Sequence, residues 1–171
     1  TNVKAGSNTQ TITTIDRTKP AKPTVSLKLG STSGSNYTSG SWTNQDVWHI
    51  VNSSDVGSGI AYYQYSYDGS SWGNDISTLG WGSSYSNGKN QLSYRINWEG
   101  QWNFYIRAVD NAGNVSDASN MFTVRIDKTA PGCSWSGESS SWTNSSRTIS
   151  VTCANSSLSG CASTGSWSYT S

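Results

Sequence analysis

Residues 92–108 read LSYRINWEGQWNFYIRA and carry the clearest structural signal in the chain. Large apolar residues alternate with polar ones on both sides of Glu99-Gly100. Because successive side chains of a β-strand point to opposite faces of its sheet, this alternation predicts strands with one buried and one polar face. A glycine within such a pattern marks a turn. The stretch therefore predicts two successive strands separated by a turn.

The same alternation recurs before and after this stretch. The sets that share a face are Val25, Leu27 and Leu29; Val47, His49 and Val51; Tyr63, Tyr65 and Tyr67; and Phe122, Val124 and Ile126. A further short strand is expected within residues 76–81. No window shows a convincing helical period. Six or seven strands with turns between them predict an all-β fold, an immunoglobulin-like β-sandwich.

The composition is typical of a secreted β-protein. Only 12% of the 171 residues are charged and 33% are hydrophobic, but 9 Trp and 9 Tyr are present. Aromatic side chains bury much area each, so few of them can build a core. A net charge of +1 without a basic run argues against nucleic acid as a partner. No stretch reaches the roughly 20 apolar residues of a membrane span, so no membrane insertion is expected.

Three short motifs occur twice, in the same order. They are Ile15–Pro20 and Ile126–Pro131, Ser41–Asn44 and Ser141–Asn144, and Ser58-Gly59 and Ser159-Gly160. The first pair is offset by 127 − 16 = 111 residues and the second by 141 − 41 = 100. The first unit thus contains about eleven extra residues, which we place in the run 30–40. A repeat of about 100 residues matches one sandwich module rather than a solenoid repeat.

This repeat divides the chain into three parts. Residues 16–127 are expected to form one complete module, and residues 128–171 the N-terminal part of a second one. Residues 1–15 are expected to be the last strand of a preceding module or an N-terminal arm. An incomplete sandwich exposes an apolar face and open sheet edges, which favour pairing with neighbouring modules or with other copies of the chain.

Several motifs resemble those of tandem bacterial immunoglobulin-like repeats. Asp127–Pro131 is similar to the DKTAP junction of that family, and Asp110–Asn114 is similar to its DNAGN turn. Ser58–Gly69 is similar to its SGI-YxYSxDG strand and turn, and Ser41–Asn44 to the segment before its second strand. The resemblance covers the first unit fully and the second in part. It implies repeat modules of microbial surface, adhesive or filament proteins, and it implies no catalytic residue.

The residues themselves also argue against an enzyme. His49 is the only histidine, and a catalytic triad would need a serine and a carboxylate directed at it. No GxSxG motif is present. Most of the ten acidic residues lie in turn or boundary motifs, where carboxylates cap backbone N–H groups. We therefore expect no catalytic residue and no cofactor.

Two kinds of binding site remain candidates. Exposed aromatic rings can stack on sugars, and Trp48, Trp72 and Trp81 are the candidates for such a surface, although packing explains them as well. Oxygen-rich turns can bind calcium, and Asp110 and Asn114 are the weak candidates, with turn formation as the default explanation. The alternative function is a carbohydrate-binding accessory module of a larger secreted enzyme, with glycans or a host surface as partners.

Cysteines occur only in the last third of the chain, as Cys133, Cys153 and Cys161. Their spacing fits no zinc motif. One disulfide and one remaining thiol is the simplest count for a secreted chain, and the sequence leaves the pairing open. The whole pattern predicts a non-catalytic structural or adhesive module of an extracellular, cell-surface or filament protein.

Overall fold

The computed structural model describes residues 14–79, 83–86, 88–154, 158–161 and 165–169. Their regular secondary structure is almost entirely β, which confirms the predicted all-β class. The strands are β1 (Thr24–Leu29), β2 (Trp42–Thr43), β3 (Val47–Asn52), β4 (Ile60–Ser66), β5 (Ser84–Ser86), β6 (Gln91–Ile96), β7 (Gly100–Asp110), β8 (Phe122–Ile126), β9 (Gly132–Ser136), β10 (Arg147–Ala154) and β11 (Gly165–Tyr169). Most of the expected N-terminal arm, residues 1–13, lies outside the described residues.

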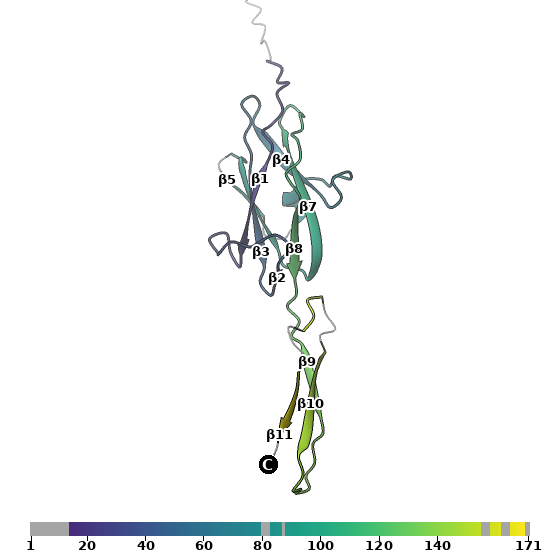
Figure 1. Cartoon of the computed structure of the whole chain (residues 1–171). Helices are drawn as coiled ribbons and strands as arrows, with labels where there is room; N and C mark the ends of the chain where they lie inside the picture. Colours follow the sequence, from purple (N-terminus) through teal and green to yellow (C-terminus); the bar gives the residue numbers. More distant parts are fainter. Residues whose placement is uncertain (1–13, 80–82, 87, 155–157, 162–164, 170–171) are drawn as a thin grey trace, which may run out of the picture.

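The first eight strands form two four-stranded sheets (Figure 1). One sheet has the order β1-β3-β6-β5 and is antiparallel throughout. The other has the order β2-β8-β7-β4, in which the short β2 runs parallel to β8. The two sheets therefore contain every strand that the alternating pattern predicts between residues 24 and 126, together with the short β2 and β5.

The two sheets face each other across one core. The imidazole ring of His49, on β3, lies 5.2 Å from the ring of Phe104 and 4.7 Å from that of Phe122, which belong to the opposite sheet. Val47 and Val51 flank His49 and are fully buried, as their shared face predicts. Burying each of these apolar side chains contributes roughly 1.5–3 kcal/mol, so a small number of residues holds the layers together.

The turn at Glu99-Gly100 carries the chain from one sheet to the other. It links β6 to β7, which lie in different sheets, so the stretch 92–108 spans the core instead of forming a hairpin. Gly100 has φ of 132°, and a Cβ there would lie 2.9 Å from the ring nitrogen of Trp102. The turn therefore requires glycine, both for its backbone conformation and for the close approach of the indole.

The strand predicted within residues 76–81 is wrong for the residues described there. Ile76–Leu79 forms a short 3₁₀-helix, η1, and the carboxylate of Asp75 accepts a hydrogen bond of 2.9 Å from the backbone N–H of Ser77. The side chain of Ile76 anchors the segment in the core. The Asp75 carboxylate caps the turn by binding a backbone N–H that a strand would pair with a neighbouring strand.

The extra residues 30–40 form a loop that packs back onto the module. Tyr37 is buried in the core, and its hydroxyl accepts a hydrogen bond of 3.0 Å from the N–H of Arg125 on β8. The same hydroxyl donates to the carbonyl of Ser41. The loop thus connects the edge of one sheet to the last strand of the other.

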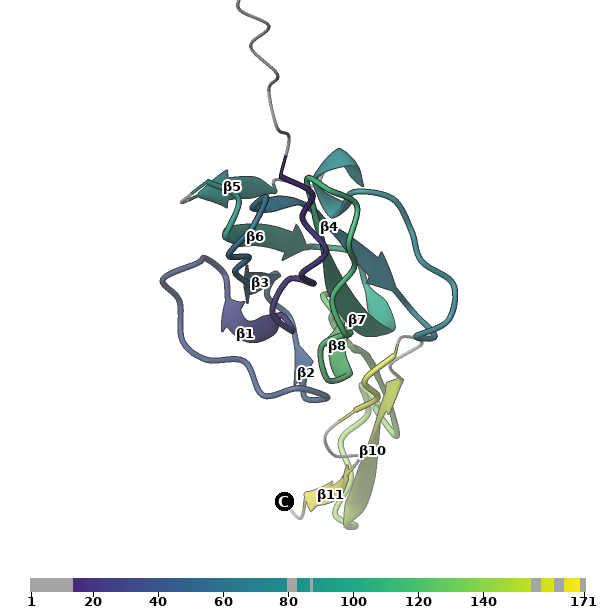
Figure 2. The same ribbon diagram turned by 90° about the horizontal axis from the view of Figure 1, so that it is seen from above.

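The last three strands form a separate antiparallel sheet with the order β11-β10-β9 (Figures 1 and 2). All five residues of β9 are exposed, and the side chain of Trp135 is 63% exposed. Among the described residues after 131, no second sheet covers this one. β9 therefore leaves exposed the kind of side-chain face that the first two sheets bury.

Candidate functional site

A carboxylate clamp fixes the segment that leads into β1. The side chain of Asp16 accepts hydrogen bonds from the backbone N–H of Thr18 at 2.9 Å and from that of Ser58 at 2.6 Å. These bonds stabilise the ionised carboxylate and lower the pKa of Asp16 below its usual value. Asp16 thus ties the segment before β1 to the loop before β4, and we call this arrangement the Asp16 clamp.

The same device recurs after β8. The carboxylate of Asp127, which is 7% exposed, accepts a hydrogen bond of 3.1 Å from the N–H of Thr129. It also accepts one of 2.9 Å from the N–H of Ser159, whose hydroxyl donates to the same oxygen. Asp127 thus ties the segment before β9 to the loop before β11, and we call this arrangement the Asp127 clamp.

The two clamps differ in sequence separation but not in plan. Asp16 and Ser58 are 42 residues apart, whereas Asp127 and Ser159 are 32 residues apart. The difference of 42 − 32 = 10 residues matches the extra run at 30–40 to within one residue. Both copies of the repeat therefore build the same contact from the same pair of residue types, an aspartate in the boundary motif and a serine before a glycine.

Two further carboxylates join the Asp16 clamp. Oxygen atoms of Asp16, Asp55 and Asp110 lie within 4.8 Å of one another. Asp110, which is 2% exposed, accepts hydrogen bonds from the N–H groups of Ala112 and Asn114 at 2.9 and 2.7 Å. The Asn114 amide donates to Asp110 at 2.8 Å and to the carbonyl of Asp16 at 3.2 Å. Three loops therefore converge on this cluster of carboxylates.

Asp55 supplies the third loop of the cluster. One of its carboxylate oxygens accepts hydrogen bonds from the N–H groups of Gly57 and Gly59 at 3.1 and 2.7 Å. The other, Oδ1, is buried and has no hydrogen-bond partner among the described residues. Most of the cluster's bonds are donated by backbone N–H groups, so holding the loops together already accounts for the carboxylates.

The calcium candidates can be compared with this geometry. Asp16, Asp55 and Asp110 are the residues that would hold a cation, since calcium prefers several carboxylate oxygens. Asp110 was among the sequence candidates. Asn114 was the other, but it turns its amide nitrogen toward Asp110, so it acts here as a hydrogen-bond donor. Asp16 was missed because it lies 94 residues before Asp110 in a boundary motif.

The structure does not bring the candidate tryptophans together. Trp48 lies on β3, and its ring nitrogen donates a hydrogen bond of 3.1 Å to the carbonyl of Gly30. Trp72 follows β4 in the other sheet, and the guanidinium of Arg107 lies 4.1 Å from the centre of its ring. Trp81 lies outside the described residues. An aromatic sugar-binding surface built from these three residues stays a prediction.

His49 is a core residue in this structure. Its side chain is fully buried, and neither ring nitrogen has a hydrogen-bond partner among the described residues. Burial lowers the pKa of His49 to about 3, so the ring is neutral at ordinary pH. The rings around it are those of Tyr94, Phe104 and Phe122.

All three cysteines carry free thiols in the structure, so the predicted disulfide is not formed. The sulfur atoms of Cys153 and Cys161 are 2.6 Å apart, which is longer than the disulfide bond of about 2.05 Å. Cys133 is exposed and stands opposite Cys153 in the strand register. The structure thus places Cys133 and Cys161 each beside Cys153, without joining any two of the three.

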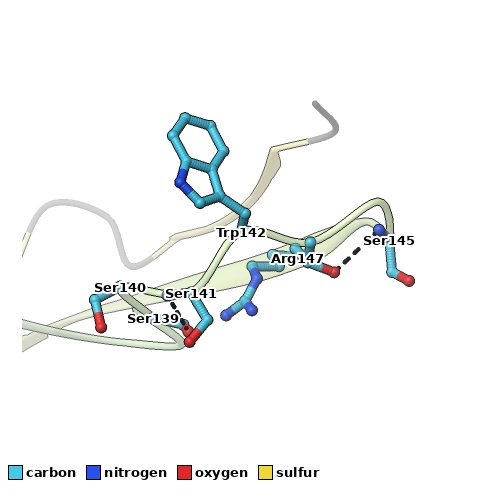
Figure 3. Close-up of a pocket in the computed structure, with 7 residues that line it drawn as sticks. Ser139, Ser140, Ser141, Trp142, Ser145 and Arg147 are labelled. Carbon is cyan, nitrogen blue, oxygen red and sulfur yellow. Dashed lines mark hydrogen bonds between the residues drawn. The ribbon is translucent and has the colours of Figure 1, made fainter.

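A shallow hollow lies beside Trp142, in the loop before β10 (Figure 3). Its other lining residues are Ser139, Ser140, Ser141, Thr143, Ser145 and Arg147. Trp142 is fully exposed, and Figure 3 shows its indole standing clear of the other labelled side chains. The matching residue of the first repeat, Trp42, is 37% exposed and pairs with Arg125 of β8.

No protein-family model matches the chain, and no match was found among curated proteins. The part of the chain that the structure describes has no helix of the length and apolarity needed to cross a membrane. The repeated motifs and the two clamps are therefore the features of the chain that bear on its function.

Proposed function

We propose that the chain is a series of immunoglobulin-like β-sandwich modules with a structural or adhesive role in a microbial cell-surface or filament protein. The observation that supports this most directly is that both boundary motifs build the same aspartate–serine clamp. A clamp repeated at successive boundaries restrains the orientation of each module relative to the segment that precedes it. Such restraint suits a chain of modules that must stay extended along one direction.

The two facing sheets support the sandwich part of this proposal. Their strands come from one continuous stretch of about 100 residues, the size expected for such a module. The turn from Asp110 to Asn114, which resembles the turn of bacterial repeats, is fixed by the bonds to the Asp110 carboxylate. The uncharged polar surface and the small net charge fit an extracellular setting.

The Asp127 clamp is strong enough to matter for the boundary. Hydrogen bonds to charged groups contribute about 1.5–3 kcal/mol each, and Asp127 is mostly buried, which limits competition from water. Because the carboxylate binds both the linker and the Ser159 loop, its loss frees the two segments together. We expect the modules to act through this fixed boundary, with neighbouring modules or other copies of the chain as partners.

Replacing the clamp carboxylate tests the proposal. In Asp127→Ala, the amide hydrogen of Ser159 should exchange with solvent at least tenfold faster, because its acceptor is gone. Small-angle X-ray scattering should show a broader spread of chain dimensions. Asp117→Ala is the matched control, since Asp117 is exposed and its ion pair with Lys19 is 3.9 Å long. Unchanged exchange and unchanged scattering in Asp127→Ala would contradict a boundary fixed by the clamp.

The carbohydrate-binding alternative needs a separate experiment. A glycan array probed with the full chain and with Trp48→Ala and Trp72→Ala distinguishes the two roles. Under the structural proposal neither substitution changes the array pattern, because one indole is bonded to Gly30 and the other is covered by Arg107. Strong sugar binding that either substitution abolishes would favour the accessory-module function.

A further inference from the structure

The three cysteines are arranged around one sulfur atom, that of Cys153 on β10. Cys133 on β9 is its direct partner in the antiparallel register. The sulfur of Cys161, in the loop that follows β10, lies 2.6 Å from it, closer than two unbonded sulfur atoms normally approach. The neighbouring thiols of Cys161 and Cys133 raise the pKa of Cys153 above its usual value. Cys153 therefore has one thiol neighbour across the sheet and one on the loop.

The three sulfur atoms do not converge into a common site. Among the described residues, the only group of three or more metal-ligating side chains whose ligand atoms lie within 4.8 Å of one another is Asp16, Asp55 and Asp110. A three-thiolate metal site would require the same closeness for the sulfurs. Cys133 and Cys161 thus approach Cys153 separately, and each is placed to react with it alone.

We propose that Cys153 is the shared member of two alternative disulfides, Cys153–Cys161 and Cys133–Cys153, which interconvert by thiol–disulfide exchange. Directly opposed residues of antiparallel strands have Cα atoms about 4.5–5.5 Å apart, within the range of about 4.4–6.8 Å that disulfides span. The Cys161 thiol already touches that of Cys153. One sulfur can hold one partner, so the two bonds exclude each other.

Forming the first disulfide requires one two-electron oxidation, and the later exchange between the two disulfides requires no oxidant. A low-molecular-weight disulfide such as oxidised glutathione takes two electrons and two protons from the thiols of Cys153 and Cys161 and is reduced to two thiols. In the exchange step, the thiolate of exposed Cys133 attacks the sulfur of Cys153. The bond to Cys161 breaks, and Cys161 leaves as a thiolate that takes up the proton lost by Cys133.

The choice of bond acts on the Asp127 clamp. Ser159, which donates two hydrogen bonds to Asp127, lies in the loop between Cys153 and Cys161. The Cys153–Cys161 bond closes this loop and holds Ser159 near the clamp, whereas the Cys133–Cys153 bond leaves the loop open. The bond isomer and the clamp are therefore coupled, and coupling is reciprocal: weakening the clamp must shift the isomers.

Single cysteine substitutions test the shared partner. The full chain and its variants are incubated with oxidised glutathione, free thiols are blocked, and the disulfides are mapped by mass spectrometry. Cys133→Ser should form only Cys153–Cys161, and Cys161→Ser only Cys133–Cys153. Cys153→Ser should form no intramolecular disulfide, although it keeps two cysteines. A Cys133–Cys161 bond that forms as readily in Cys153→Ser as the other bonds do in their variants would overturn the proposal.

A second measurement tests the coupling without removing a cysteine. In Asp127→Ala the ratio of Cys133–Cys153 to Cys153–Cys161 should rise at least twofold over that of the native chain. Asp16→Ala, which removes the clamp of the cysteine-free first module, should leave the ratio unchanged. An unaltered ratio in Asp127→Ala would overturn the coupling. The near-ultraviolet circular dichroism of the full chain checks folding in every variant. The disulfide proposal does not depend on the proposed function of the modules.

Discussion

Residues 16–127 and 128–171 begin with the same motifs but pair their strands differently. In the first region β4 follows Ser58-Gly59 and pairs with β7, in the sheet opposite β3. In the second, β11 follows Ser159-Gly160 and pairs with β10, the counterpart of β3. It thus occupies the place that β6 holds in the first region. A strand must pair its backbone groups with some neighbour, and the described part of the second region has no counterpart of β7.

The comparison shows that an alternating sequence specifies a strand but not its neighbour. β4 crosses to the second sheet because residues 105–110 of β7 offer it a pairing partner there. The first region also buries both inner faces, whereas the residues of β9 stay exposed. Side-chain burial should therefore dominate stability in the first region and contribute little in the second.

The largest expected difference between the regions is the cost of removing an aromatic ring. Phe104→Ala, in the core of the first region, should lower the free energy of unfolding by about 3–5 kcal/mol, because it leaves a cavity beside His49 and Phe122. Trp135→Ala, on exposed β9, should change it by no more than about 0.5 kcal/mol. Urea unfolding of the full chain measures both. Equal losses would mean that the second region has a core of its own.

An intermediate effect is expected from acid. The pKa of His49 is about 3 in the folded chain and about 6.5 when unfolded, so the unfolded state binds the proton first. Protonation of this histidine therefore costs no stability above pH 6.5, and stability is lost progressively as the pH falls from 6.5 toward 3. His49→Leu should flatten that part of the curve. Thermal melts at a series of pH values compare the two proteins, and parallel curves would contradict a neutral buried imidazole.

Much of the fold was predictable because period-two alternation reports burial directly. His49 shows both the strength and the limit of this signal: its position between Val47 and Val51 placed it on their shared face, and it is fully buried there. The helical turn at Ile76 was not predictable, because a single buried side chain fits a strand and a turn equally well. The alternating pattern also did not predict which sheet each strand joins, as the different partners of β4 and β11 show.

The clamps illustrate why the candidate site was only half visible. Asp16, Asp127, Ser58 and Ser159 all belong to repeated motifs, so the sequence singled them out. The sequence did not show which aspartate contacts which serine, because the hydrogen-bonded residues are 42 and 32 positions apart and no short motif links them. Their near-equal separation, once the extra run 30–40 is subtracted, was the available clue. Cys153 and its two neighbours posed the same difficulty, since strand register decides which thiols meet.

The smallest expected difference concerns the matching tryptophans of the two regions. Trp42 pairs with β8, and the guanidinium of Arg125 lies 5.9 Å from its ring centre, so Trp42→Ala should destabilise the chain by about 0.5–1 kcal/mol. Trp142 is fully exposed, and Trp142→Ala should leave stability unchanged while removing the most exposed indole of the described residues, which iodide quenches readily. If Trp142→Ala instead destabilised the chain as much as Trp42→Ala, a surface equivalent to β8 would have to cover Trp142 in solution.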